Sequence, residues 1–75
     1  MAKGTIAKLV RTHGSAWGRI CPEGTTRTVF FNPASLAAET HFAGLEEGQH
    51  VRFDEERDHV NGSLAIQVAV AELSS

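Results

Sequence analysis

The sequence contains one cysteine, no tyrosine and no long apolar run among its 75 residues. Because Cys21 has no second cysteine to pair with, no intrachain disulfide can stabilise the fold. A lone thiol is typical of a reducing compartment, which predicts a cytoplasmic protein. No apolar stretch approaches the roughly 20 residues of a membrane span, and the start of the chain lacks the apolar core of a secretory signal. We therefore expect a soluble protein with no membrane partner.

An excess of positive charge is also missing, because seven lysines and arginines stand against nine aspartates and glutamates, for a net charge of −2. A protein that binds double-stranded nucleic acid through many phosphate contacts needs a basic surface. The net charge therefore argues against broad electrostatic binding to a nucleic-acid duplex. The charges are unevenly placed. Residues 3–27 hold five basic residues and one acidic residue, whereas residues 39–58 hold seven acidic and two basic residues. Either an anionic partner on the N-terminal strands or an ordinary solvated surface explains this asymmetry.

Catalytic and metal-binding patterns are equally scarce. His41, His50 and His59 recur every nine residues, but none has a second histidine or cysteine at ligand spacing, so we predict no metal site and no cofactor. No general base is indicated for Cys21, and the sequence has no glycine-rich phosphate loop. The acidic run at residues 54–58 is interpreted as a solvated strand edge. We therefore predict a protein that is not an enzyme and has no small-molecule substrate.

Turn-forming residues divide the chain into pieces of five to nine residues, a spacing typical of an all-β barrel or sandwich. The predicted strands are residues 5–10, 16–21, 27–32, 49–55 and 63–71. Seventy-five residues make a single domain, and closing its sheet into a barrel removes exposed edges. Asn32 and Pro33 are suited to cap and begin a short helical segment over residues 33–39. The predicted fold class is all-β, a five-stranded antiparallel barrel.

Alternation of apolar and polar residues within the predicted strands separates a core face from a solvent face. The predicted core consists of Ile6, Ile20, Val29, Phe31, Val51, Phe53, Leu64, Ile66, Val68 and Val70. In the last strand, this pattern sets Leu64, Ile66, Val68 and Val70 on one face.

The solvent faces of the second and third predicted strands carry two large aromatic residues, Trp17 and Phe30. The short turn at residues 22–24 pairs these strands as a hairpin, which brings both rings together with Arg19 and Asn32. Single-stranded bases stack on such rings for about 1–3 kcal/mol each, while Arg19 can stack or bind phosphate and Asn32 can bind a base edge. The alternative is that a loop or a dimer partner covers the rings, because exposed aromatic patches also mark protein interfaces.

Five segments resemble the motifs of cold-shock domains, in the same order along nearly the whole chain. These segments are Gly4-Thr5-Ile6-Ala7-Lys8, Ala16-Trp17-Gly18-Arg19-Ile20, Val29-Phe30-Phe31-Asn32-Pro33, Phe42-Ala43-Gly44-Leu45-Glu46-Glu47-Gly48-Gln49-His50-Val51-Arg52-Phe53 and Gly62-Ser63-Leu64-Ala65-Ile66-Gln67-Val68. The fourth segment is the most similar, because the family there reads Phe-x-x-Leu-x-Glu-Gly-Gln-x-Val-x-Phe.

The resemblance implies an OB-type barrel that binds single-stranded RNA or DNA through its first three strands. Proteins of this family act as RNA chaperones or as regulators of transcription or translation, often in bacteria. Trp17 matches the base-stacking aromatic of the second strand, and Phe30 matches the phenylalanine of the third-strand motif. Phe42 matches a ligand-contacting loop phenylalanine, and Lys8 matches the lysine of the first strand.

The sequence departs from the family at several of these positions. Arg19 replaces the second aromatic of the second strand, Asn32 replaces a histidine, and Pro33 replaces the phenylalanine that follows it. The aromatic pair of the first strand is replaced within residues 8–10. With about half of the aromatic residues left, binding is predicted to be weaker, more salt-sensitive or altered in its base preference. We expect a monomer that binds single-stranded nucleic acid. The alternatives are a dimer and a barrel that serves as a protein-interaction module.

Overall fold

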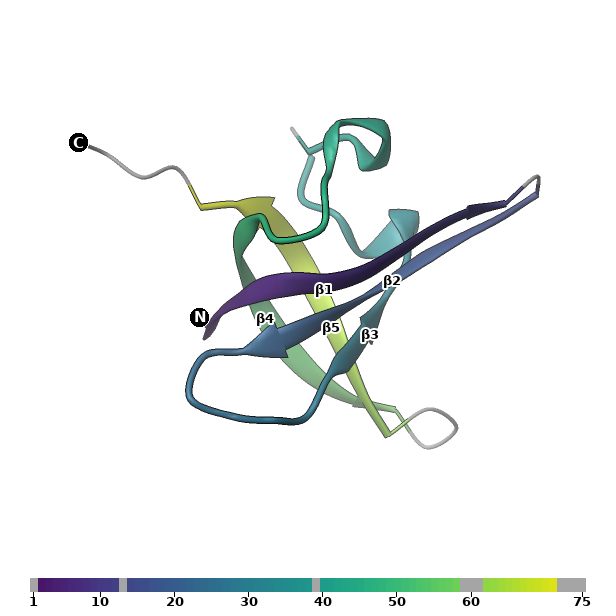
Figure 1. Ribbon diagram of the computed structural model, residues 1–75. Helices are drawn as coiled ribbons and strands as arrows, with labels where there is room; N and C mark the ends of the chain where they lie inside the picture. The colour runs from purple at the N-terminus through teal and green to yellow at the C-terminus, as the bar shows by residue number, and fades with distance from the viewer. Residues whose placement is uncertain (1, 13, 39, 59–61, 72–75) are drawn as a thin grey trace.

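The computed structural model describes residues 2–12, 14–38, 40–58 and 62–71. Its elements are the strands β1 (Ala2–Thr12), β2 (Ser15–Pro22), β3 (Val29–Phe31), β4 (His50–Asp58) and β5 (Gly62–Val70), and the single-turn 3₁₀ helices η1 (Pro33–Ser35) and η2 (Phe42–Gly44). The strands form a closed barrel in the order β1-β2-β3-β5-β4, with a long β1–β2 hairpin that extends beyond the barrel (Figure 1). The predicted five-stranded β-barrel is confirmed and is consistent with an OB-type barrel. Within the described residues, no helix has the length and apolar character needed to cross a membrane.

The sequence predicted a barrel that is antiparallel throughout, but one pair of strands in the structure is parallel. β3 and β5 pair in parallel, with Phe30 opposite Leu64, whereas the other strand pairs are antiparallel. The reason is geometric. Strands that alternate in direction cannot do so all the way round a closed barrel of five, because an odd number leaves one seam between strands of the same direction. The third strand was predicted over residues 27–32, but β3 contains only three residues. These three residues pair with β2 on one side and with β5 on the other.

The buried core lies inside the barrel. Its members are Ile6, Ile20, Val29, Phe31, Leu45, Val51, Phe53, Ala65 and Val68. The prediction is therefore confirmed for the first four strands, and Leu45 joins them from the connection between β3 and β4. It is wrong for Leu64 and Ile66, which are only half-buried, and Val70 packs against the core without being fully buried.

A β-bulge in β5 causes this error. Arg52 lies opposite Ala69, but Asp54 lies opposite Ile66, so two residues of β5 face the single residue between them on β4. One of these two is Gln67, whose φ of 53° is in the left-handed region. An extra residue in one strand exchanges the inner and outer faces beyond it. Ala65 therefore points into the core, and the larger Leu64 and Ile66 remain on the outside.

The predicted helical segment is short. Pro33 begins η1, which ends at Ser35, and Asn32 caps it as predicted. The Asn32 carboxamide oxygen accepts hydrogen bonds from the backbone N–H and the hydroxyl of Ser35, each at 3.1 Å. The end of the predicted segment, residue 39, lies outside the described residues.

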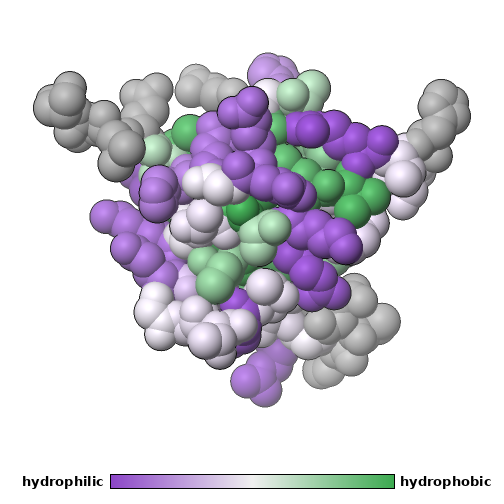
Figure 2. Space-filling model, viewed as in Figure 1, coloured by the Kyte–Doolittle hydropathy of each residue, from purple (hydrophilic) through white to green (hydrophobic). Residues whose placement is uncertain are grey.

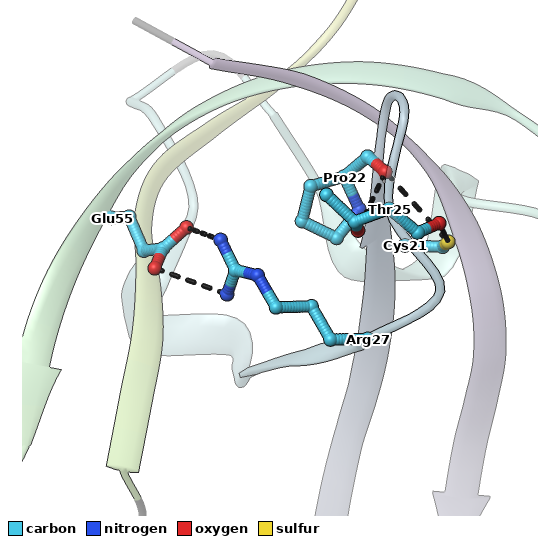
Figure 3. Close-up of polar contacts among 5 residues, drawn as sticks. All are labelled: Cys21, Pro22, Thr25, Arg27 and Glu55. Atoms are coloured by element: carbon cyan, nitrogen blue, oxygen red, sulfur yellow. Dashed lines mark hydrogen bonds and ion pairs between the residues drawn. The ribbon is translucent and has the colours of Figure 1, made fainter.

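The loop between β2 and β3 is held at both ends (Figure 3). At its start, the Cys21 thiol donates to the carbonyl oxygen of Thr25 at 3.3 Å, and the Thr25 hydroxyl donates to the carbonyl oxygen of Pro22 at 3.0 Å. At its end, Arg27 donates two hydrogen bonds to the carboxylate of Glu55 on β4, at 2.8 and 3.1 Å. The hydrogen bond and charge of Arg27 lower the pKa of Glu55, and Glu55 in turn raises the pKa of Arg27.

This ion pair predicts a small, pH-dependent difference in stability between the native protein and a Glu55→Gln variant. Because the pKa of Glu55 is lower in the folded state than its ordinary value of 4.5, the ion pair stabilises the fold above that pH. The stabilisation is lost as the pH falls through the folded-state pKa. Thermal unfolding between neutral pH and about pH 3 is expected to show a melting-temperature gap that closes at the acid end.

The matched control is Glu46→Gln, because Glu46 is an exposed glutamate with no side-chain ion pair to another described residue. This variant is expected to show no comparable gap at neutral pH. A gap for Glu55→Gln that persists unchanged at about pH 3 contradicts the assignment.

Candidate nucleic-acid interface

Trp17 on β2 and Phe30 on β3 lie next to each other on the outer face of the barrel. Their ring centroids are 6.0 Å apart and their planes differ by 25°, which is a stacked arrangement. Both side chains are half-buried, whereas Ile20 and Val29 on the same two strands are completely buried. The alternation predicted for these two strands is therefore confirmed. The stacked rings, called the aromatic pair below, keep part of their surface open to solvent.

Two cations lie close to the indole ring of the aromatic pair. The Lys8 Nζ atom is 5.7 Å from the Trp17 ring centroid, and the Arg19 Cζ atom is 5.8 Å from it. Both distances fall within the range of about 6 Å for a cation–π interaction. Arg19 also donates to the Thr28 hydroxyl at 3.4 Å. Since both cations are on exposed residues, their remaining donors face solvent, where a phosphate can reach them.

A β-bulge in β1 puts Lys8 on this face. Ile6 pairs with Ile20 inside the barrel, but Lys8 pairs with Arg19 on the outside, so Ala7 is an extra residue in the strand. Without the bulge, strict alternation sets Lys8 on the same face as Ile6, toward the core. The resemblance predicted Lys8 as a site residue, but the pattern of β1 alone does not explain how its side chain reaches the aromatic pair.

Asn32 lies at the edge of the site, directly after β3. Because its carboxamide oxygen accepts two hydrogen bonds from Ser35, its structural role is the cap of η1. The amide NH₂ group is the part of this side chain left for the predicted contact with a base edge.

Phe42 is not brought to the aromatic pair. Its ring packs against Phe31, with centroids 5.9 Å apart, and the Arg11 guanidinium carbon lies 5.8 Å from its centroid. Arg11 also donates to the carbonyl oxygen of Leu45. Arg11 pairs with the residue before Trp17 on β2, so strand alternation points it to the opposite face of the hairpin from Trp17. Phe42 therefore belongs to the inner side of the β1–β2 hairpin, where Arg11 holds it, a contact that sequence reasoning missed.

Leu64 adjoins the aromatic pair from β5. Its backbone lies opposite Phe30 in the parallel seam, and its side chain is half-buried on the outer face. The sequence pattern predicted that this leucine lies in the core. No local signal corrects the error, because glutamine at position 67 is not a residue type that favours the left-handed conformation of the bulge.

The surface view is consistent with this arrangement. β1 and β2 lie at the front of the barrel in Figure 1, and the same view in Figure 2 shows white and green surface in the middle of that face, with purple side chains around it. A partly apolar area with polar borders is typical of a binding surface.

The part of the chain that the structure describes contains no group of three or more histidine, cysteine, aspartate or glutamate residues placed to hold a metal ion. His59 lies outside the described residues. No protein-family model matches the sequence, and no curated protein matches it. The cold-shock resemblance therefore stays a prediction that depends on the motifs quoted above.

Proposed function

We propose that the chain binds single-stranded RNA or DNA, without catalysis, through the aromatic pair and its two neighbouring cations. The observation that carries this proposal is the pair of stacked, partly exposed rings with Lys8 and Arg19 within 6 Å of the Trp17 centroid. Stacking of bases on aromatic rings is tolerant of sequence because every base has a π-face. Cations beside the rings then bind the phosphates of the same strand. The proposed cellular role is that of an RNA chaperone or a regulator of transcription or translation.

The expected affinity is modest. Two aromatic rings provide two stacking contacts of about 1–3 kcal/mol each, and two cations provide about two phosphate contacts. The two stacks supply about 2–6 kcal/mol, which is less than the roughly 8.2 kcal/mol of a complex with a dissociation constant of about 1 µM. A dissociation constant on the order of tens of micromolar or weaker is therefore expected at low salt. For a single strand, two phosphate contacts predict a slope of about −1.4 for the logarithm of affinity against the logarithm of salt concentration.

Fluorescence of the native protein tests the proposal, because Trp17 is the only tryptophan. An oligo-dT or oligo-U of about eight nucleotides is expected to quench Trp17 emission saturably at low salt, with quenching reversed by added salt. A duplex of the same length is the control and is expected to quench far less, because its bases are already stacked. A lack of change with either single strand at low salt overturns the proposal.

Protein binding through the same face is the second candidate function. It is favoured by Leu64, which lies opposite Phe30 and enlarges the apolar area there. Ile66, which is half-buried two residues further along β5, and the net charge of −2 also favour it. A stable dimer or partner complex that protects Trp17 from a soluble quencher, and that an oligonucleotide does not dissociate, supports this alternative. Chemical-shift changes confined to β2 and β3 on adding an oligonucleotide contradict it.

A further inference from the structure

One row of directly paired residues crosses the outer face of all five strands. Lys8 on β1 pairs with Arg19 on β2, and Arg19 pairs with Phe30 on β3. Phe30 pairs with Leu64 on β5, and Leu64 pairs with Glu56 on β4. Residues opposite each other in neighbouring strands point to the same face and are within contact distance of their neighbours. This cross-strand row therefore changes from two cations through an aromatic and an aliphatic side chain to a carboxylate.

The order of these side chains depends on the two β-bulges. The bulge at Ala7 turns Lys8 outward at one end of the row, and the bulge at Gln67 turns Leu64 outward near the other end. Glu56, at the acidic end, is exposed. Arg57, the next basic residue on β4, points away from this face by strand alternation and so does not neutralise Glu56 within the row.

We propose that this cross-strand row gives bound single-stranded nucleic acid one orientation. The phosphates lie over Lys8 and Arg19, the bases extend across Phe30 onto Leu64, and Glu56 keeps the phosphate backbone away from β4. This inference depends on the proposed function and adds two residues to it, an apolar base contact and an acidic boundary.

The two ends of the row differ in charge. A phosphate at the β1–β2 end meets two cations, whereas a phosphate at the β4 end meets a carboxylate with no cation beside it in the row. A carboxylate repels a phosphate placed beside it, and this repulsion weakens as the salt concentration increases. When Lys8 and Arg19 hold the phosphate, the base of the same nucleotide extends across Phe30. Its apolar face then packs on the Leu64 side chain.

Leu64→Ala tests the base contact. Removing the leucine side chain is expected to weaken oligonucleotide binding ~3- to 10-fold, with the salt dependence unchanged because no charge is removed. Leu36→Ala is the matched control, since Leu36 is also a half-buried leucine but pairs with Val68, away from the row. Leu36→Ala is expected to bind as the native protein does. Equal affinity of Leu64→Ala and the native protein overturns the assignment of Leu64.

Glu56→Lys tests the acidic boundary. The new cation is expected to tighten binding ~10-fold at low salt and to steepen the logarithmic salt slope by ~0.7, the increment for one more phosphate contact. Glu46→Lys changes the net charge equally but lies outside the row, so it is the control and is expected to have a much smaller effect. Equal tightening by both variants overturns the boundary, because it shows a general effect of net charge.

The outcomes separate this inference from the proposed function. If an oligonucleotide quenches the Trp17 emission of the native protein but neither Leu64→Ala nor Glu56→Lys behaves as expected, the proposed orientation is wrong and nucleic-acid binding stands. If the native protein does not bind single strands at all, the proposed function itself falls. A nitroxide on the oligonucleotide backbone gives a direct check, because it is expected to broaden the amide signals of Lys8 and Arg19 more than that of Glu56. The reverse order of broadening contradicts the orientation.

Discussion

Replacing Trp17 with alanine is expected to weaken single-stranded oligonucleotide binding ~10- to 100-fold while the barrel stays folded. The substitution removes one stacking surface and also the ring that holds Phe30, Lys8 and Arg19 in place. The fold is expected to survive, because Trp17 is half-buried on the outer face and is not part of the core. Anisotropy of a labelled oligonucleotide is the suitable measurement, since this variant has no tryptophan emission.

Trp17→Phe is the matched control for this prediction. It keeps an aromatic ring on β2 beside Phe30 and is expected to weaken binding less than Trp17→Ala does, by under ~10-fold. Circular dichroism of both variants checks that the strands are retained. Native affinity in Trp17→Ala shows that bases do not stack at this position.

Gly18→Ala is expected to cause the largest loss of stability among the substitutions considered, ~3 kcal/mol or more. A Cβ atom at this position lies 2.6 Å from Cε1 of Phe31 and 2.7 Å from the carbonyl oxygen of Lys8. Phe31 is completely buried, so its ring has no free space to move into, and the carbonyl belongs to the paired strand β1. A domain of this size is stable by only about 4–11 kcal/mol, so such a loss leaves a substantial unfolded population on mild heating. Urea or thermal unfolding followed by circular dichroism measures the change.

Gly44→Ala serves as the control, because a Cβ atom there has no neighbour within 4 Å. This variant is expected to unfold within about 0.5 kcal/mol of the native protein. An unfolding midpoint for Gly18→Ala equal to that of Gly44→Ala contradicts the close packing of β2 on Phe31.

The same glycine connects the fold to the site. Gly18 lies between Trp17 and Arg19 on β2 and pairs with Phe31 on β3. Its missing side chain lets Phe31 fill the core directly beneath the strand, while its two neighbours point outward. Core packing and presentation of the aromatic pair are therefore set by alternate residues of one short strand.

Patterns confined to one strand or one turn were predictable from the sequence. Alternation in β2 and β3 put Ile20 and Val29 inside and Trp17 and Phe30 outside. The Asn32 cap was predictable because an N-cap depends on residue types only a few positions apart. These features have local causes, so a single sequence contains the information needed to infer them.

Tertiary structure decided what depends on strand register and closure. The bulges at Ala7 and Gln67 arise from matching β1 and β5 to their partner strands, and they determine whether Lys8 and Leu64 face outward. Phe42 follows its loop to the inner side of the hairpin, where Arg11 covers it.

The amino-acid sequence by itself determined that this chain forms a small all-β barrel with an outward-facing tryptophan and phenylalanine on neighbouring strands. Only the folded barrel decided which other side chains surround those rings, including the change from cations on β1 and β2 to a carboxylate on β4. The physical reason is that alternation is a property of each strand, whereas the neighbours across a sheet are set by pairing between distant segments, and one extra residue exchanges the two faces.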